Sequence, residues 1–229
     1  ARSTLRAEAQ LAMAHADAGQ WEEFARIAED AYTRARPVLG MDDVVTLSLA
    51  ASVGSAWQVF GRHDDARPLL KEVIATQRAA PGERTPEYYR ALNALGASLM
   101  ATREFEEAAV VIREEFEGAL RTQVPDHPQI LAARNQLGVV LMSLNRYDEA
   151  EPLLVENLEA LRRVVPPGHW HLGMGATSLG GVQIKVGKYD EACDTLEEAC
   201  AILNEAMGPT SNGAIVTRRR FINALRSVS

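Results

Sequence analysis

Two histidines and two cysteines are the side chains of this chain whose spacing could support chemistry. His169 and His171 flank Trp170, and imidazole nitrogens are common metal ligands. Two histidines alone are a weak metal signal, because a zinc site needs three or four protein ligands. Cys193 and Cys200 are seven residues apart. On one helix their Cα atoms would lie ~10 Å apart, too far for a disulfide. We therefore predict no metal site and two free cysteines, buried as small apolar side chains in a reducing compartment.

No pattern in the sequence is typical of a catalytic or cofactor site. It has no glycine-rich phosphate loop, no nucleophile elbow and no Cys/His pair at metal-ligand spacing. Aspartate and glutamate are plentiful, but they fall where exposed helix faces are expected, the usual solvated pattern. We therefore predict that this segment is not an enzyme, has no catalytic residues and needs no cofactor.

Charge and hydropathy restrict the partners. The chain has 229 residues and a formal net charge of −7, which argues against nucleic acid as the main partner, since phosphate binding needs a basic face. It contains no apolar run of membrane-spanning length and no visible signal peptide. We expect a cytoplasmic protein with no membrane association. The chain begins at Ala1, already inside a helical pattern, so we expect it to be a fragment of a longer protein.

A fixed step of 42 residues organises the whole sequence. Glycine recurs at this step, at Gly54, Gly96, Gly138 and Gly180. An acidic motif keeps the same step, appearing as Phe105-Glu106-Glu107-Ala108, Tyr147-Asp148-Glu149-Ala150 and Tyr189-Asp190-Glu191-Ala192. A period in this range indicates one structural unit stacked on itself. We therefore predict a single array over 1–229, with repeats 1–42, 43–84, 85–126, 127–168 and 169–210 and a capping helix at 211–229.

Each repeat reads as two helices joined by a tight turn. Pro86 and Pro128 fit the start of a first helix, where a missing N–H loses no hydrogen bond. The turns are expected at Gly19, Gly61, Arg103, Asn145 and Gly187, and acidic residues follow them, favourable at a helix N-terminus. The recurring glycine lies where the two helices should approach most closely. The fold predicted is all-α: five helix-turn-helix repeats, ended by a helix with one apolar and one arginine-rich face.

These residues resemble the tetratricopeptide repeat family, in the 42-residue form found in kinesin light chains and bacterial relatives. The fourth repeat carries the likeness most fully, with His127-Pro128, Asn135 and Asn145-Arg146-Tyr147-Asp148-Glu149-Ala150-Glu151-Pro152-Leu153. HEAT-type arrays have similar periods, but they would not explain the spaced glycine together with Tyr-x-Glu-Ala. The resemblance implies an α-solenoid, a right-handed superhelix of antiparallel helix pairs. It also implies that a peptide binds in the concave groove of the first helices.

Helix geometry gives the expected groove positions. If positions 8, 11, 12 and 15 of a repeat form the core, positions 6, 9, 13 and 16 face another side. The candidate peptide-binding residues on that stripe are Arg90, Asn93, Met100, Asn135, Val139, Met142, Thr177 and Arg219. An asparagine amide donates and accepts hydrogen bonds and so can pair with any peptide backbone; the resemblance implies this role for Asn93 and Asn135. The alternatives are that these asparagines bridge helices and that the methionines, adaptable apolar side chains, pack between repeats.

Basic residues suggest the charge of the ligand. Arg90, Arg134 and the run Arg218–Arg220 would make one end of the groove basic and favour an acidic peptide. The alternative for the run is a solvated face on the last helix. The main hypothesis is a scaffold that binds a peptide segment of a partner protein. One alternative is a regulatory or sensor arm of a bacterial Ser/Thr kinase or STAND-type ATPase, an analogy with other such arrays. Another is a self-associating array, since apolar surface is expected around Leu5, Leu11 and Trp21.

Overall fold

The computed structural model describes residues 2–228, and every regular element in that range is a helix. The helices form five pairs and one terminal helix. Their bounds are α1 Arg2–Asp17, α2 Trp21–Leu39, α3 Val44–Val59, α4 His63–Ala79, α5 Pro86–Ala101, α6 Phe105–Thr122, α7 Pro128–Ser143, α8 Tyr147–Val164, α9 Trp170–Lys185, α10 Tyr189–Met207 and α11 Asn212–Val228. Each predicted repeat contains one helix pair, and the all-α prediction is confirmed.

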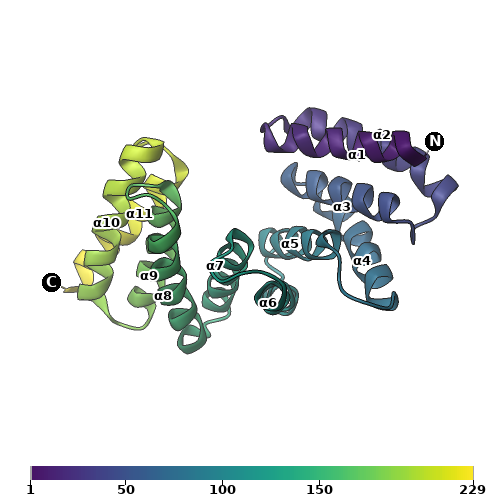
Figure 1. Ribbon diagram of the computed structural model, residues 1–229. Coiled ribbons are helices and arrows are strands. Elements are labelled where there is room, and N and C mark those ends of the chain that lie inside the picture. The colour runs from purple at the N-terminus through teal and green to yellow at the C-terminus, as the bar shows by residue number, and fades with distance from the viewer. Residues whose placement is uncertain (1, 229) are drawn as a thin grey trace. The chain divides into compact units, whose positions relative to one another are not determined.

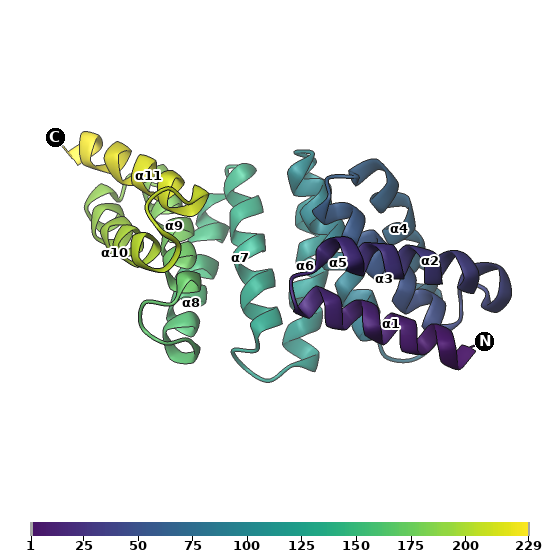
Figure 2. The ribbon, with the colours of Figure 1, turned by 90° about the horizontal axis from the view of Figure 1, so that it is seen from above.

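The chain divides into two compact units, with the boundary between Glu115 and Phe116 inside α6. In unit 1, each helix from α1 to α5 packs against the next (Figure 1), and α3 also contacts both α1 and α5. In unit 2, α7 to α11 pack consecutively in the same way (Figure 2), and α9 also contacts α7 and α11. Within each unit, the first helices of successive repeats therefore lie side by side.

The tight turns fall at the predicted positions. The backbone φ is positive at Gly19, Gly61 and Gly187, and also at Arg103 (65°) and Asn145 (59°). Asparagine tolerates this left-handed conformation better than most residues, whereas arginine has no such preference. Arg103 adopts it because its N–H donates to the carbonyl of Met100 and so closes the helix end.

The two helices of a repeat approach most closely at the recurring glycine. A Cβ atom built on Gly96 of α5 would lie 2.6 Å from Cγ1 of Ile112 in α6. A Cβ atom on Gly138 of α7 would lie 2.6 Å from Cγ of Leu154 in α8. Both distances are far below van der Waals contact, so only glycine fits without a shift of the helix pair. The packing role predicted for this glycine is confirmed in both units.

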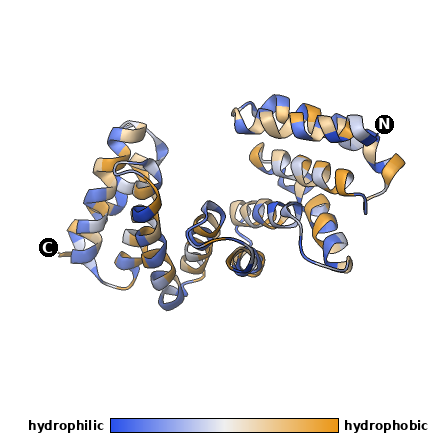
Figure 3. Cartoon of the chain, in the orientation of Figure 1, coloured by the Kyte–Doolittle hydropathy of each residue, from blue (hydrophilic) through white to orange (hydrophobic). Residues whose placement is uncertain are grey.

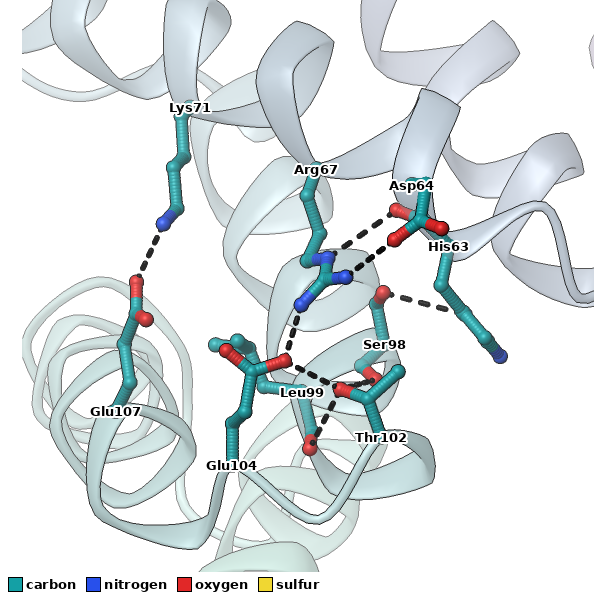
Figure 4. A network of polar contacts seen from close by, with 9 residues as sticks. All are labelled: His63, Asp64, Arg67, Lys71, Ser98, Leu99, Thr102, Glu104 and Glu107. Atoms are coloured by element: carbon teal, nitrogen blue, oxygen red, sulfur yellow. Dashed lines mark hydrogen bonds and ion pairs between the residues drawn. The ribbon is translucent and has the colours of Figure 1, made fainter.

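Neighbouring repeats are also joined by ion pairs on their second helices. In unit 1, Lys71 of α4 pairs with Glu107 of α6 at 2.7 Å, and Arg67 pairs with Glu104 just before α6 (Figure 4). In unit 2, Arg162 of α8 pairs with Glu198 of α10 at 2.7 Å. Exposed pairs of this kind each add little stability, so burial of the apolar helix faces holds the repeats together. Hydrophobic and hydrophilic residues alternate along the helices as that burial requires (Figure 3).

The first helix pair, α1 and α2, and the last described helix, α11, expose apolar side chains. Leu11 and Trp21 are 50% and 39% exposed, as predicted, but the prediction for Leu5 was wrong: it is buried against Ala31 and Leu49. The outer face of α11 also differs from the prediction. It is only partly charged, because large apolar side chains are exposed among its arginines, at Ile215, Ile222 and Leu225. Ile222 occupies the repeat position that glycine takes in four earlier repeats.

Candidate functional site

The first helices of unit 1 form a hollow of about 790 Å³ that is open to solvent. It is lined from three repeats by side chains of α1, α3 and the start of α5. Its apolar floor includes Ala9, Met13 and Val45, and Ser48 and Arg90 line it from α3 and α5. The hollow therefore runs across three consecutive first helices.

Charged side chains of both signs line this hollow. Arg2, Arg6 and Arg90 line it together with two acidic residues, Asp17 and Glu87. Arg2 is already paired with Asp43 at 2.9 Å. Within residues 2–228, Arg6 has no carboxylate partner, and the one side-chain hydrogen bond of Arg90 goes to Oγ of Ser52 at 3.5 Å. Two guanidinium groups are therefore available to a carboxylate from outside.

Asn93 lies on α5, half-buried, and is engaged inside its own repeat. Its Nδ2 donates to Oε1 and Oε2 of Glu115, at 3.2 and 3.5 Å. Glu115 is only 1% exposed. Burial raises the pKa of this carboxyl to about 7, while the hydrogen bond from Asn93 acts in the opposite direction. The proposed ligand contact of Asn93 thus competes with an existing hydrogen bond to a buried acid.

The matching region of unit 2 contains a separate pocket of about 430 Å³, formed by α7, α8 and α9. Three amide side chains line it: Asn135, Gln136 and Asn157. The side-chain oxygen of each is buried without a hydrogen-bond partner within the described residues. The rest of the lining is largely apolar, with Leu131, Leu161, Val164, Trp170 and Met174. The pocket therefore combines apolar walls with several amides that have unused hydrogen-bonding capacity.

The ionisable groups of this pocket leave it close to neutral. Asp126 accepts hydrogen bonds from Nε and Nη2 of Arg163, both at 2.9 Å, and this pairing lowers the pKa of the carboxyl. Burial and the neighbouring His169 lower the pKa of His171, so its imidazole is uncharged at neutral pH. Among the described residues that line the pocket, none provides a free carboxylate or a free cation.

The other residues predicted for the groove in unit 2 differ in solvent exposure. Val139 and Met142 are half-buried on α7, and Met142 reaches α9: a Cβ on Gly181 would lie 3.2 Å from its Cε. The prediction for Thr177 was wrong. It is 4% exposed, because α11 covers it and Oγ1 of Thr217 lies 2.7 Å from its hydroxyl.

The arginine run of α11 differs from the prediction in a second way. Arg219 is exposed, whereas its neighbour Arg220 lies against α9 and donates from Nη1 to the carbonyl of Thr177 at 2.6 Å. Burial lowers the pKa of the Arg220 guanidinium. A Cβ on Gly181 would lie 2.6 Å from Nη1 of Arg220, so a small residue is needed there.

The remaining predicted residue of unit 1, Met100, is half-buried on α5.

Glu115 and Asn157 were not among the predicted residues, although the period relates them. Positions 9 and 31 of the repeats hold the pairs Ala9/Ala31, Ala51/Val73, Asn93/Glu115, Asn135/Asn157 and Thr177/Ala199. Position 31 is buried in every repeat. Polar residues occur there only in the two repeats that have asparagine at position 9. This pairing could have been read from the sequence, since it needs only the 42-residue step.

The histidines and cysteines have structural positions. Nδ1 of His169 accepts from the backbone N–H of His171 at 3.3 Å, so it caps the start of α9. Within residues 2–228, no cluster of three or more metal-ligating side chains occurs. Cys193 and Cys200 are free, as predicted, but half-buried rather than buried. None of the described helices is both long and apolar enough to cross a membrane.

Comparison with known proteins agrees with this geometry. Residues 130–171, the fourth repeat and the start of the fifth, match the tetratricopeptide repeat family. The repeats of a Podosopora anserina protein described as a kinesin light chain superpose with a TM-score of 0.72 at 21% identity, covering 90% of this chain and 97% of that one. BtubC (BKLC) from P. vanneervenii superposes with a TM-score of 0.71 at 14% identity, covering 91% and 84%.

A third structure, the apo form of RapI, superposes with a TM-score of 0.70 at 14% identity, and covers 97% of this chain but 58% of RapI. No curated protein sequence matches the chain. The fold and the repeated helix pairs are those of an all-α tetratricopeptide-repeat array. The fold resembles that of the repeats described as a kinesin light chain. Identities this low establish the fold and do not identify a ligand.

Proposed function

We propose that the chain is a protein–protein interaction scaffold that binds an extended segment of a partner along the inner faces of its first helices. The hollow of unit 1 carries the proposal, because it is open, spans three first helices and is lined by apolar side chains and by charged side chains that include two arginines without a carboxylate partner in the described chain. Tetratricopeptide folds commonly mediate protein–protein interaction and are typically not catalytic. We assign the chain no reaction and no cofactor.

The proposed segment is acidic. Arg6 and Arg90 support this preference, because both line the hollow without a carboxylate partner in the described chain. Charge-assisted hydrogen bonds from a guanidinium to a carboxylate are stronger than neutral ones. In unit 1 the proposed contacts include Asn93 and Met100, and in unit 2 they include Asn135, Val139 and Met142. Thr177 is not among them, because it is covered. Arg219 remains a proposed contact at the exposed edge of α11.

The test is selection of peptides from a random displayed library on the full chain. Selected peptides are expected to be rich in Asp and Glu. Their affinity should fall about tenfold or more in Arg6→Ala/Arg90→Ala, since each lost charged hydrogen bond counts for more than 1 kcal/mol. Arg26→Ala/Arg121→Ala makes the same charge change on exposed residues outside the hollow, and should bind as the wild type does. If no peptide is retained, or if both variants lose affinity equally, the groove proposal is wrong.

Self-association is a second candidate, favoured by the exposed apolar residues of α1, α2 and α11. Sedimentation of the full chain over a range of concentrations tests it. A mass that rises with concentration, and that falls back in Leu11→Ser/Ile222→Ser, would support an array that stacks through its ends. The regulatory-arm alternative rests on the sequence analogy alone.

A further inference from the structure

The unpaired amide of Asn157 is the least explained polar group in unit 2. Asn157 is 2% exposed, and within residues 2–228 its Oδ1 accepts no hydrogen bond. Buried polar atoms in folded proteins nearly always have a partner, because burying an unpaired one costs free energy. Asn157 lines the pocket of unit 2 beside Asn135 and Gln136, whose side-chain oxygens are also buried without a donor.

The fold itself does not require an amide at this position. The same repeat position holds Ala31, Val73 and Ala199 elsewhere, all fully buried and all apolar. The other polar residue in the series, Glu115, has an internal partner in Asn93. Asn157 is therefore the single member of the series that is polar, buried and unpaired within the described residues. An apolar residue would satisfy the packing, so the amide is explained better by a ligand.

The surroundings indicate which chemical group would fit. A lysine or arginine would need a free carboxylate, but Asp126 is held by two hydrogen bonds from Arg163. An acidic group would need a cation, and none of the described residues that line the pocket is an unpaired cation. A carboxamide is neutral, and it both donates and accepts, so it complements Asn157 and Asn135 whichever way their amides are turned. Leu131, Leu161 and Met174 provide apolar contacts for the methylene groups of its side chain.

We propose that the pocket formed by α7, α8 and α9 binds the side-chain carboxamide of an asparagine or glutamine in the partner segment, and that Asn157 recognises it. This inference rests on the proposed function, because it names a side chain that a bound segment inserts. Gln136 and Asn135 provide the neighbouring hydrogen-bonding groups at the wall of the pocket.

The test uses the peptides selected on the full wild-type chain. Asparagine or glutamine should be enriched at one position. Replacing that residue in a synthetic peptide, Gln by Met or Asn by Leu, should weaken binding about tenfold or more. The protein variant Asn157→Leu should lose the same factor and should no longer distinguish the two peptides. The matched control Asn223→Leu, on an exposed position of α11 outside the pocket, should keep both the affinity and the preference.

Thermal unfolding separates recognition from a structural role. Because Asn157→Leu removes an unpaired buried amide, its Tm should rise, by about 2–4 °C for each kcal/mol gained. A lower Tm would show that the amide stabilises the fold and would overturn the inference. Selected peptides without an Asn or Gln preference, or equal binding by Asn157→Leu, would also overturn it while leaving the proposed function in place. If the wild type retains no peptide, both proposals fail.

Discussion

The third and fourth repeats place two polar residues at the same pair of positions and use them differently. In unit 1, Asn93 donates to the buried carboxyl of Glu115, so the pair is closed on itself. In unit 2, Asn135 and Asn157 both line a pocket, and their side-chain oxygens have no partner in the described residues. Position 31 therefore holds an acid with an internal hydrogen bond in the third repeat and an unpaired amide in the fourth.

Glu115 and Asn157 also differ in what their burial costs. A buried carboxylate is costly, so Glu115 retains its proton up to a pH near 7, with one amide donor available when it ionises. A buried amide has no charge to neutralise, so the unpaired Asn157 does not titrate, although its burial still costs free energy. In unit 1 the buried carboxyl of Glu115 should make stability fall as the pH rises toward 7, whereas in unit 2 the equivalent Asn157 adds no such dependence.

The largest expected loss of stability comes from filling the recurring glycine, and it should be similar in both units. Gly96→Leu and Gly138→Leu each place a side chain where a Cβ alone would lie 2.6 Å from a side-chain carbon of the second helix. Insertion of single methylenes into a packed core costs about 1–3 kcal/mol. Leucine adds four carbons, so the free energy of unfolding in urea should fall by more than about 3 kcal/mol. Retention of wild-type stability by either variant would show that the helix pair of that repeat is not tightly packed.

The second expected effect is a dependence of stability on pH that comes from Glu115 of unit 1. Below its ordinary pKa of 4.5, Glu115 is protonated in both folded and unfolded chains. As the pH rises from there to about 7, the unfolded chain releases the proton and the folded chain retains it, so stability falls; above about 7 this contribution is constant. The loss is on the order of 3 kcal/mol. Urea unfolding at several pH values should show this decline in the wild type, and Glu115→Gln should remove it. An unchanged decline in Glu115→Gln would assign it to another group.

The third effect distinguishes the two asparagines directly. Asn93→Ala removes the donor to Glu115 and should lower the free energy of unfolding by about 1.5–3 kcal/mol above pH 7, where the carboxyl is ionised. The cost should be smaller at pH 5, where Glu115 is protonated. Asn135→Ala removes no hydrogen bond of its side chain within the described chain and should change stability by less than about 0.5 kcal/mol. Equal losses in the two variants would mean that Asn135 also has a structural partner.

The sequence predicted the repeated structure well because one step of 42 residues fixes it. The turns at Arg103 and Asn145 and the glycine contacts follow from equivalence between repeats, and the structure confirms them. Equivalence between repeats is a poorer guide at α11, which packs against both α9 and α10. There Thr177 is covered by Thr217, and Arg220 rather than Arg219 lies on α9. Pocket residues such as Asn157 were missed because they lie on second helices, outside the stripe from which the groove was predicted.

The smallest effect concerns the exposed ion pairs, which should again be alike in both units. Lys71→Ala breaks the pair with Glu107, and Arg162→Ala breaks the pair with Glu198. Both pairs are solvated, so each variant should lose about 1 kcal/mol or less, and the loss should shrink as salt screens the charges. Urea unfolding at low and high ionic strength measures this. A large loss in one unit that persists in high salt would show that its second helices depend on their ion pairs. Such a difference would mean that the two units also differ in how their second helices are held together.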